Sequence, residues 1–306
     1  GVYVLFESGD FFAWNHAGQL QWERSLQADY GPFVNKFGLA ASVAQCDSLC
    51  FVLLEHSGPS HLLGIDKRTG KETWKAERGA RGHSWTSPSV MRTDGGDYVL
   101  VSSLGDVDAY RANDGRKMFT FDGLGGNSVA TPIDRGQGRF LVSSLIRPAD
   151  GPVENATRSN RLLRLVHEDG ECRIRDEWTA TEARGGFGSP VLHDPYSYWI
   201  SAQGVLYCVD SETGDAHYAE RLPCGGCWAT PLISDGRLYC FGKEGETVIV
   251  ELGDRYRVVS EDNHLWPDET QTLYAAVAIP EGLLLRSGQR VYRVDTPRET
   301  TPGGEN

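Results

Sequence analysis

The sequence lacks the features of several large protein classes. Its best apolar runs, such as residues 98–104, have the length of a strand, whereas a membrane-spanning helix needs roughly 18 apolar residues. Acidic residues outnumber lysine and arginine, and the net charge of the 306 residues is −12. Binding to nucleic-acid phosphates requires clustered basic residues, which are missing. We therefore expect no transmembrane segment and no nucleic-acid partner.

The familiar motifs of catalysis are also missing. No glycine-rich loop opens a helix, as a phosphate-binding loop would, and no Gly-x-Ser-x-Gly elbow is present. The eight histidines are scattered and lack the spacing of a zinc-binding pair. Acidic turns at residues 94–97 and 106–108 do not have the spacing of a calcium loop, so we expect solvated turns. The sequence thus predicts no catalytic residue and no metal site.

The sequence does contain an internal repeat. Residues 64–74 align with residues 208–218, because both segments place Asp, Thr-Gly and an aromatic residue at the same offsets. Each copy is typical of a β-hairpin, in which a tight turn ends in glycine and the second strand carries the aromatic residue. Looser copies have their turn glycines at Gly18, Gly115 and Gly170. The spacing of these glycines fits one four-stranded propeller blade.

A second repeated pattern lies upstream of each hairpin. In its fullest form it is Trp85-Thr86-Ser87-Pro88, followed by an apolar run. Small residues are expected where short inner strands crowd around a propeller axis. The copies of this pattern are residues 39–42, 85–88, 129–132, 187–190, 228–231 and 274–277.

Together the two patterns predict an all-β fold, a seven-bladed β-propeller of four-stranded antiparallel blades without helices. Two incomplete ends are typical of a ring that closes between its termini. The alternative is a fragment of an eight-bladed propeller. Residues 1–296 are then a single domain, residues 146–160 an insertion and residues 297–306 a disordered tail. We expect complete blades at 38–77, 84–123, 127–181, 185–223 and 227–265, and three-stranded units at 1–26 and 272–294.

The hairpin pattern resembles the signature of the pyrroloquinoline-quinone (PQQ)-like repeat β-propeller family. Asp66, Thr69-Gly70 and Trp74 match that signature completely, and the resemblance is closest to bacterial propellers of this class without an assigned activity. The family includes quinoprotein dehydrogenases and non-catalytic scaffolds such as the lipoprotein of the outer-membrane β-barrel assembly machinery. Its dehydrogenases hold PQQ against a disulfide of adjacent cysteines and a calcium ion. This chain has no adjacent cysteines, so we predict no cofactor, with PQQ and calcium as the alternative.

Residues just before the inner strands are expected around one mouth of the central channel, because all blades enter from the same side. Aromatic side chains with a few polar groups are typical of a binding surface. The alternative is that these aromatic residues pack between neighbouring blades. The predicted ligand-binding residues are Lys36, His83, Trp85, Asn127, Arg184, Phe187, Trp228 and Tyr274, with Cys227 beside them.

Seven cysteines leave at least one unpaired within the chain. Cys224 and Cys227 have the spacing of a redox disulfide or of half a zinc site. Cys46 and Cys50 flank an expected hairpin turn. Both pairs are candidate disulfides, and free thiols are the alternative.

These observations favour a non-enzymatic binding or scaffold propeller that contacts a protein partner or a small ligand at the channel mouth. The alternative is an enzyme, either a degenerate quinoprotein oxidoreductase or a sugar-active propeller. The family resemblance implies a periplasmic or extracellular location. The sequence leaves the identity of the partner and the oligomeric state open.

Overall fold

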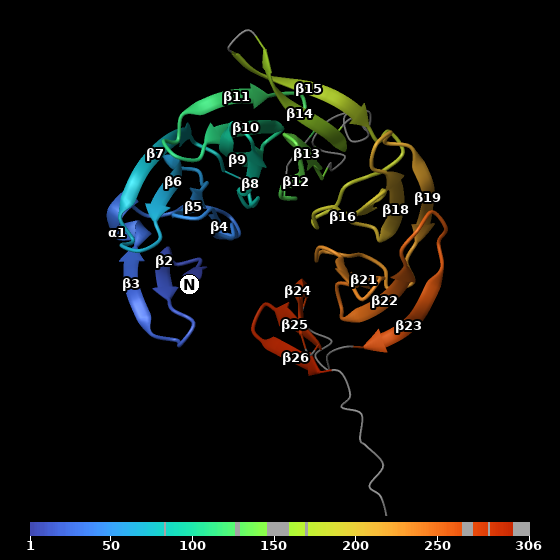
Figure 1. Cartoon of the computed structure of the whole chain (residues 1–306). Coiled ribbons are helices and arrows are strands. Elements are labelled where there is room, and N and C mark those ends of the chain that lie inside the picture. Colours follow the sequence, from blue (N-terminus) through green and yellow to red (C-terminus); the bar gives the residue numbers. More distant parts are fainter. Residues whose placement is uncertain are drawn as a thin grey trace, which may run out of the picture.

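The computed structural model of the chain is a ring of seven antiparallel β-sheets (Figure 1). It describes residues 1–82, 84–125, 129–145, 159–168, 171–264, 272–280 and 282–295. Each sheet is built from strands that are consecutive in sequence and pair with their neighbours. The predicted seven-bladed propeller is therefore confirmed, and each sheet falls within a predicted blade or end unit to within a few residues.

The first three sheets come from residues 2–121. The first has three strands, β1 (Val2–Leu5), β2 (Asp10–Trp14) and β3 (Leu20–Ser25). The second has four, β4 (Ala44–Gln45), β5 (Leu49–Leu54), β6 (Ser60–Asp66) and β7 (Glu72–Gly79). The third also has four, β8 (Ser89–Thr93), β9 (Gly96–Ser103), β10 (Asp106–Arg111) and β11 (Lys117–Phe121).

The other four sheets follow in the same manner. The fourth contains β12 (Ile133–Gly136), β13 (Arg139–Val142), β14 (Arg161–Glu168) and β15 (Glu171–Thr179). The fifth contains β16 (Val191–His193), β17 (Tyr196–Ile200), β18 (Val205–Asp210) and β19 (Ala216–Arg221). The sixth contains β20 (Leu232–Ser234), β21 (Arg237–Phe241), β22 (Glu246–Glu251) and β23 (Val258–His264). The seventh has three strands, β24 (Leu273–Ile279), β25 (Gly282–Ser287) and β26 (Val291–Asp295).

Apolar side chains fill the spaces between neighbouring sheets. The sequence of β5 is almost continuously apolar because both faces of this strand are buried. Phe51 and Leu53 pack toward the third sheet, and Val52 and Leu54 pack toward the first. Because each inner sheet has a neighbour on both faces, the core is divided among the interfaces between blades.

Hydrogen bonds between small residues join the blades near the axis, where the first strand of each four-stranded sheet lies (Figure 1). The Ser42 N–H donates to Ser87 Oγ at 2.8 Å, and the Thr131 N–H donates to Ser189 Oγ at 2.9 Å. The Ser189 N–H in turn donates to Thr230 Oγ1 at 3.0 Å. The small hydroxyl residues of the second repeat pattern therefore link one blade to the next.

Tryptophans join the blades at the outer rim. Trp74 on β7 donates its Nε1–H to Ala112 O at 2.9 Å, and its ring lies against the turn glycine Gly115 of the next sheet. A Cβ on Gly115 would lie only 2.3 Å from the Trp74 ring. The aromatic residue of the repeat signature thus fastens its blade to the following one. The same contact joins Trp22 to Gly70 and Trp178 to Gly214.

The two end sheets do not complete each other. Among the described residues, β1–β3 and β24–β26 form separate three-stranded sheets, and no hydrophobic cluster joins them. Gly18 has the turn position of Gly115, yet nothing in the described chain lies within 4 Å of its would-be Cβ. Val2 and Val291, on the two end sheets, are 46% and 69% exposed. The predicted closure between the termini is therefore not made by strand pairing.

One short helix departs from the prediction of a helix-free chain. α1 (Leu26–Tyr30) follows β3 and buries Leu26 completely in the cluster between the first two sheets. The helix ends at Gly31, whose φ of 88° suits glycine. The sequence pattern missed it because a single turn has no periodicity to detect. Within the described ranges, no helix is long and apolar enough to cross a membrane.

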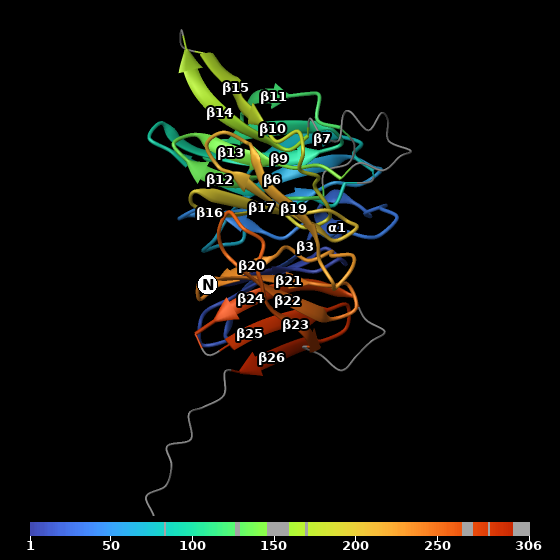
Figure 2. The same ribbon diagram turned by 90° about the vertical axis from the view of Figure 1, so that its right-hand side faces the viewer.

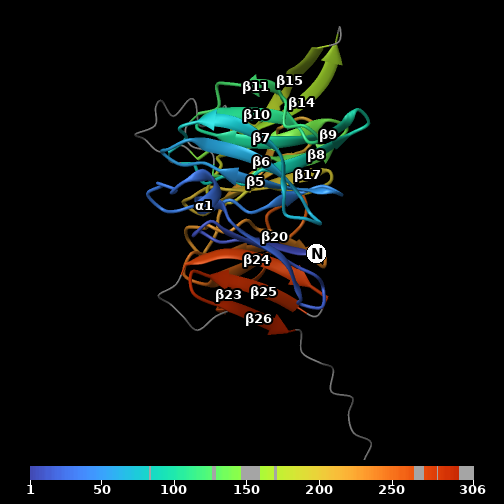
Figure 3. The ribbon, with the colours of Figure 1, turned by 90° about the vertical axis from the view of Figure 1, so that its left-hand side faces the viewer.

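The β14–β15 hairpin extends beyond the rest of the ring in both edge-on views (Figures 2 and 3). It packs against β11 of the preceding sheet. Most of the predicted insertion at 146–160, and all of the predicted tail at 297–306, lie outside the described residues.

A buried ion cluster joins the second and third sheets. Arg78 Nε donates to Glu55 Oε1 at 2.7 Å, and Arg78 Nη1 donates to Asp108 Oδ2 at 2.8 Å. All three side chains are almost completely buried. Burial alone would raise the pKa of Asp108, but Arg78, Thr120 and Lys117 hold that pKa below its usual value. The prediction of a solvated turn at residues 106–108 is wrong for Asp108, because its ion-pair partner Arg78 comes from another blade.

Candidate binding surface at the channel mouth

The loops that lead into the inner strands carry three of the predicted aromatic residues. Trp85 precedes β8, Phe187 precedes β16 and Trp228 precedes β20, and each side chain is partly exposed. These loops occupy the same place in each repeat, so they are expected on one side of the ring. The three residues thus stand at the same place in the repeat, directly before an inner strand, and their role in binding stays a prediction.

The first aromatic cluster contains Trp85, Phe37 and Lys36. The ring centroids of Phe37 and Trp85 are 5.4 Å apart, and Lys36 Nζ lies 5.2 Å from the Phe37 centroid. Phe37 is 65% exposed, so the cluster presents an aromatic surface to solvent. Sequence reasoning missed Phe37, which stands in the loop before β4, two residues ahead of the copy of the second pattern at 39–42.

The second cluster contains Phe187, Trp228 and Lys243. The ring centroids of Phe187 and Trp228 are 4.7 Å apart, and Lys243 Nζ lies 4.8 Å from the Trp228 ring centroid. Lys243 is exposed and comes from the turn between β21 and β22. No local sequence signal relates it to Trp228, because the contact depends on how the sheet folds.

The remaining predicted residues are not part of these clusters. Arg184 is exposed in the loop before β16. Burial raises the pKa of Tyr207, and the positive charge of Arg184 partly opposes this increase. Cys227 is almost completely buried. His83 and Asn127 lie outside the described residues, and of Tyr274 the structure describes only the backbone in β24.

An aromatic ring beside a lysine can bind two kinds of group. The ring face buries apolar side chains, and the ammonium group attracts carboxylates. Aromatic residues are also the side chains that most often dominate binding energy at protein interfaces. The two clusters therefore offer aromatic faces and ammonium groups, which suit apolar and acidic groups.

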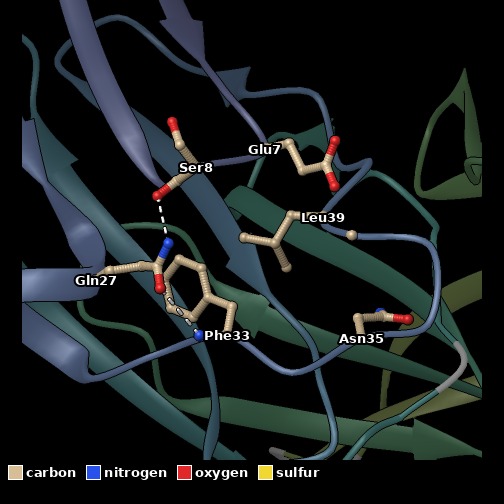
Figure 4. A pocket seen from close by; sticks show the side chains of 7 residues that line it. Glu7, Ser8, Gln27, Phe33, Asn35 and Leu39 are labelled. Atoms are coloured by element: carbon tan, nitrogen blue, oxygen red, sulfur yellow. Dashed lines mark hydrogen bonds between the residues drawn. The ribbon is translucent and has the colours of Figure 1, made fainter.

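A polar pocket of about 390 Å³ lies beside the first cluster, where the first sheet meets the segment after α1 (Figure 4). Gln27 Nε2 donates to Ser8 O at 2.7 Å, and the Phe33 N–H donates to Gln27 Oε1 at 3.4 Å. None of the predicted site residues lines this pocket. Its lining residues are Glu7, Ser8, Gln27, Phe33, Asn35, Gly38 and Leu39.

All seven cysteines are free thiols in the structure. Cys46 packs against the cluster between the second and third sheets, whereas Cys50 is buried in the cluster between the first and second. Cys224 Sγ and Cys227 Sγ are 3.9 Å apart, too far for a disulfide bond but within van der Waals contact. The structure thus brings Cys224 and Cys227 together and packs Cys46 and Cys50 into different clusters.

The sequence and the fold both have known relatives. Residues 1–120 match the family model described as outer membrane protein assembly factor BamB, a model of PQQ-like repeats. BamB from Moraxella catarrhalis is 13% identical, with a TM-score of 0.56 over 94% of this chain and 91% of that one. Residues 1–120 therefore resemble the PQQ-like repeat proteins, and the whole chain has a β-propeller fold. No curated protein matches its sequence.

Other solved structures share only the propeller fold of this chain. A europium-containing methanol dehydrogenase is 13% identical, with a TM-score of 0.61 over 96% of this chain and 76% of that one. The C-terminal WD40 domain of Sif2 is 12% identical, with a TM-score of 0.63 over 94% and 76% of the two chains. Identities this low show a common architecture alone.

The residues of this propeller do not fit the quinone site that the family resemblance implies. The sequence has no adjacent cysteines. In the ranges that the structure describes, no three His, Cys, Asp or Glu side chains converge to hold a metal ion. We derive no reaction step through PQQ, and the expectation that the protein has no cofactor stays a prediction.

Proposed function

We propose that the protein is a non-catalytic scaffold that binds a protein partner at its channel mouth. The observation that carries this proposal is the pair of partly exposed aromatic and lysine clusters, built around Trp85 and Trp228 at equivalent places in the repeat. The match of residues 1–120 to a family model described as an assembly factor supports a scaffold role.

The partner is expected to present an extended segment with apolar and acidic side chains. Apolar groups would be buried against the rings of Trp85 and Trp228, while Lys36 and Lys243 would pair with carboxylates. The chain as a whole carries a net charge of −12. An acidic segment would therefore be directed to the two lysines and repelled elsewhere.

The location proposed for this scaffold is outside the cytoplasm. The proposal rests on the likeness to BamB, whose family model is described as an outer membrane assembly factor.

Replacing either Trp85 or Trp228 by alanine is expected to weaken binding by about 30-fold, the effect of losing about 2 kcal/mol at an interface hot spot. The probe is a linear peptide selected on the immobilised protein from a phage-displayed library. Its affinity is measured by calorimetric titration, and the melting temperature of each variant is measured in parallel. Both variants should melt within a few degrees of the wild type.

Trp14→Ala is the matched control, because Trp14 is a partly exposed tryptophan that stacks on Phe12 in the first sheet. This variant should bind the peptide with wild-type affinity. The proposal is wrong if Trp85→Ala and Trp228→Ala lower the melting temperature strongly while the folded variants keep full affinity. That result would mean that the two rings pack between blades and do not bind a partner.

A further inference from the structure

Cys224 and Cys227 lie in the loop between β19 and β20, directly before Trp228. We propose that these two cysteines form a reversible disulfide, and that its state sets the position of Trp228 at the channel mouth. The first part stands on the geometry of the loop alone. The second part rests on the proposed function of the mouth.

The loop is built so that the bond can close. The two Sγ atoms are 3.9 Å apart, and a disulfide requires an approach to about 2.05 Å. Only glycines separate the two cysteines, and Gly225 already has a φ of 69°, which other residues rarely adopt. Because glycine backbones rotate most freely, a movement of about 2 Å does not require a rearrangement of the sheet.

The two thiols differ in the way that a stepwise exchange reaction requires. Cys224 is partly exposed, whereas Cys227 is only 2% exposed. The hydrogen bond from the Cys227 thiol lowers the pKa of Cys224, and the same contact, with burial, raises the pKa of Cys227. Since the thiolate is the nucleophile, Cys224 is the attacking sulfur and Cys227 the resolving one.

The oxidant is an external disulfide, such as oxidised glutathione. The Cys224 thiolate attacks one sulfur of that disulfide, forms a mixed disulfide and releases one small thiolate. Cys227 then loses its proton and attacks Cys224 Sγ, which closes the loop disulfide and releases the second thiolate. The protein thiols lose two electrons and two protons, and the external disulfide becomes two thiols.

The other five cysteines are poorly placed for the same reaction. Cys172 lies in β15 and packs against the cluster between the third and fourth sheets, away from the loop. Cys240 and Cys208 are fully buried, and burial raises the pKa of both thiols. Cys46 and Cys50 pack into different clusters. A zinc site is not supported either, since within the described part of the chain no third ligand joins Cys224 and Cys227. The redox reaction should therefore be confined to one pair.

Closure of the disulfide would act directly on the second aromatic cluster. Trp228 follows Cys227 in the chain, and the Lys243 N–H donates to the carbonyl of Gly226, inside the loop, at 2.8 Å. Lys243 in turn places its ammonium group over the Trp228 ring. A change in the loop thus reaches both the ring and the lysine that would contact a partner.

Thiol trapping tests the redox pair. The intact protein is equilibrated in glutathione buffers from reduced to oxidised, quenched with acid, alkylated with iodoacetamide after unfolding and mapped by mass spectrometry. Cys224 and Cys227 should lose their adducts together and regain them on reduction, while the other five cysteines stay alkylated. The proposal is overturned if the pair stays alkylated in fully oxidised buffer, or if either cysteine instead bonds to another position.

Single variants give a second, independent readout. Disulfide formation should quench the fluorescence of the neighbouring Trp228, so oxidation should lower the emission of the wild type and of the control Cys46→Ser. The change should be absent in Cys224→Ser and in Trp228→Phe. An equal drop in Cys224→Ser would contradict the assignment.

The effect on the mouth is measured separately. The affinity for the peptide that was selected on the immobilised protein should differ between the oxidised and reduced protein by at least about fivefold. Cys224→Ser should abolish the difference. If the disulfide forms but both states bind the peptide equally, the coupling is wrong and the redox pair stands. If neither state binds any peptide, the proposed function fails, and the thiol-trapping result is unaffected.

Discussion

Replacing Arg78 by methionine is expected to lower the free energy of unfolding by about 3–5 kcal/mol, because one partner of a buried ion pair is removed. Asp108 would keep Lys117 and Thr120, whose donor atoms lie 2.9 Å and 2.6 Å from its Oδ1. Glu55 would keep only the hydroxyl of Ser103, at 3.0 Å, among the partners that the structure describes. The measurement is urea unfolding at neutral pH.

A surface ion pair provides the control for this prediction. Arg173 lies 3.0 Å from Glu171, and both side chains are more than half exposed, so Arg173→Ala should cost less than about 1 kcal/mol. Adding Glu55→Gln to Arg78→Met should recover part of the loss, because a buried charge is then removed. If Arg78→Met costs no more than Arg173→Ala, the cluster does not hold the second and third sheets together.

Replacing Gly115 by alanine is expected to cost about 2–5 kcal/mol. The new Cβ would lie 2.3 Å from the Trp74 ring, so either the ring or the turn must move, and overpacking of this kind costs about 1–3 kcal/mol. The φ of 69° at Gly115 adds the penalty of about 1–2 kcal/mol that an L residue incurs there. The same unfolding measurement gives the value.

Gly18→Ala is the matched control, because Gly18 ends the corresponding turn of the first sheet with a φ of 77°. Nothing in the described chain lies within 4 Å of its would-be Cβ, so only the backbone penalty of about 1–2 kcal/mol is expected. The difference between the two variants measures the contact with Trp74. Equal losses would show that docking of tryptophan on the turn glycine contributes little to blade packing.

The sequence predicted the blades well because each one repeats a local pattern. Trp74 and Gly115 both belong to the hairpin signature, and their spacing alone placed the strands on either side of them. What a local pattern does not contain is the contact between the two residues, which lie in different sheets. The docking of one blade on the next therefore became visible only in the structure.

For the candidate site, too, the sequence predicted the residues of the repeat pattern but not their contacts with other segments. Trp85, Phe187 and Trp228 follow from the second repeat pattern, since each precedes an inner strand. Lys243 comes from a turn between two later strands, and no periodicity connects it with Trp228. Asp108 was wrongly expected in solvent for the same reason, because Arg78 reaches it from another sheet. These two misses, Lys243 and Asp108, are pairings between segments that are distant in sequence.

The most direct test of the account is a calorimetric titration of the protein with PQQ in the presence of calcium, with the quinone absorbance followed in parallel. The account of a non-catalytic, partner-binding propeller predicts no saturable heat and no change in the quinone spectrum. Saturable, stoichiometric binding with a spectral shift would contradict it and would favour a quinoprotein oxidoreductase.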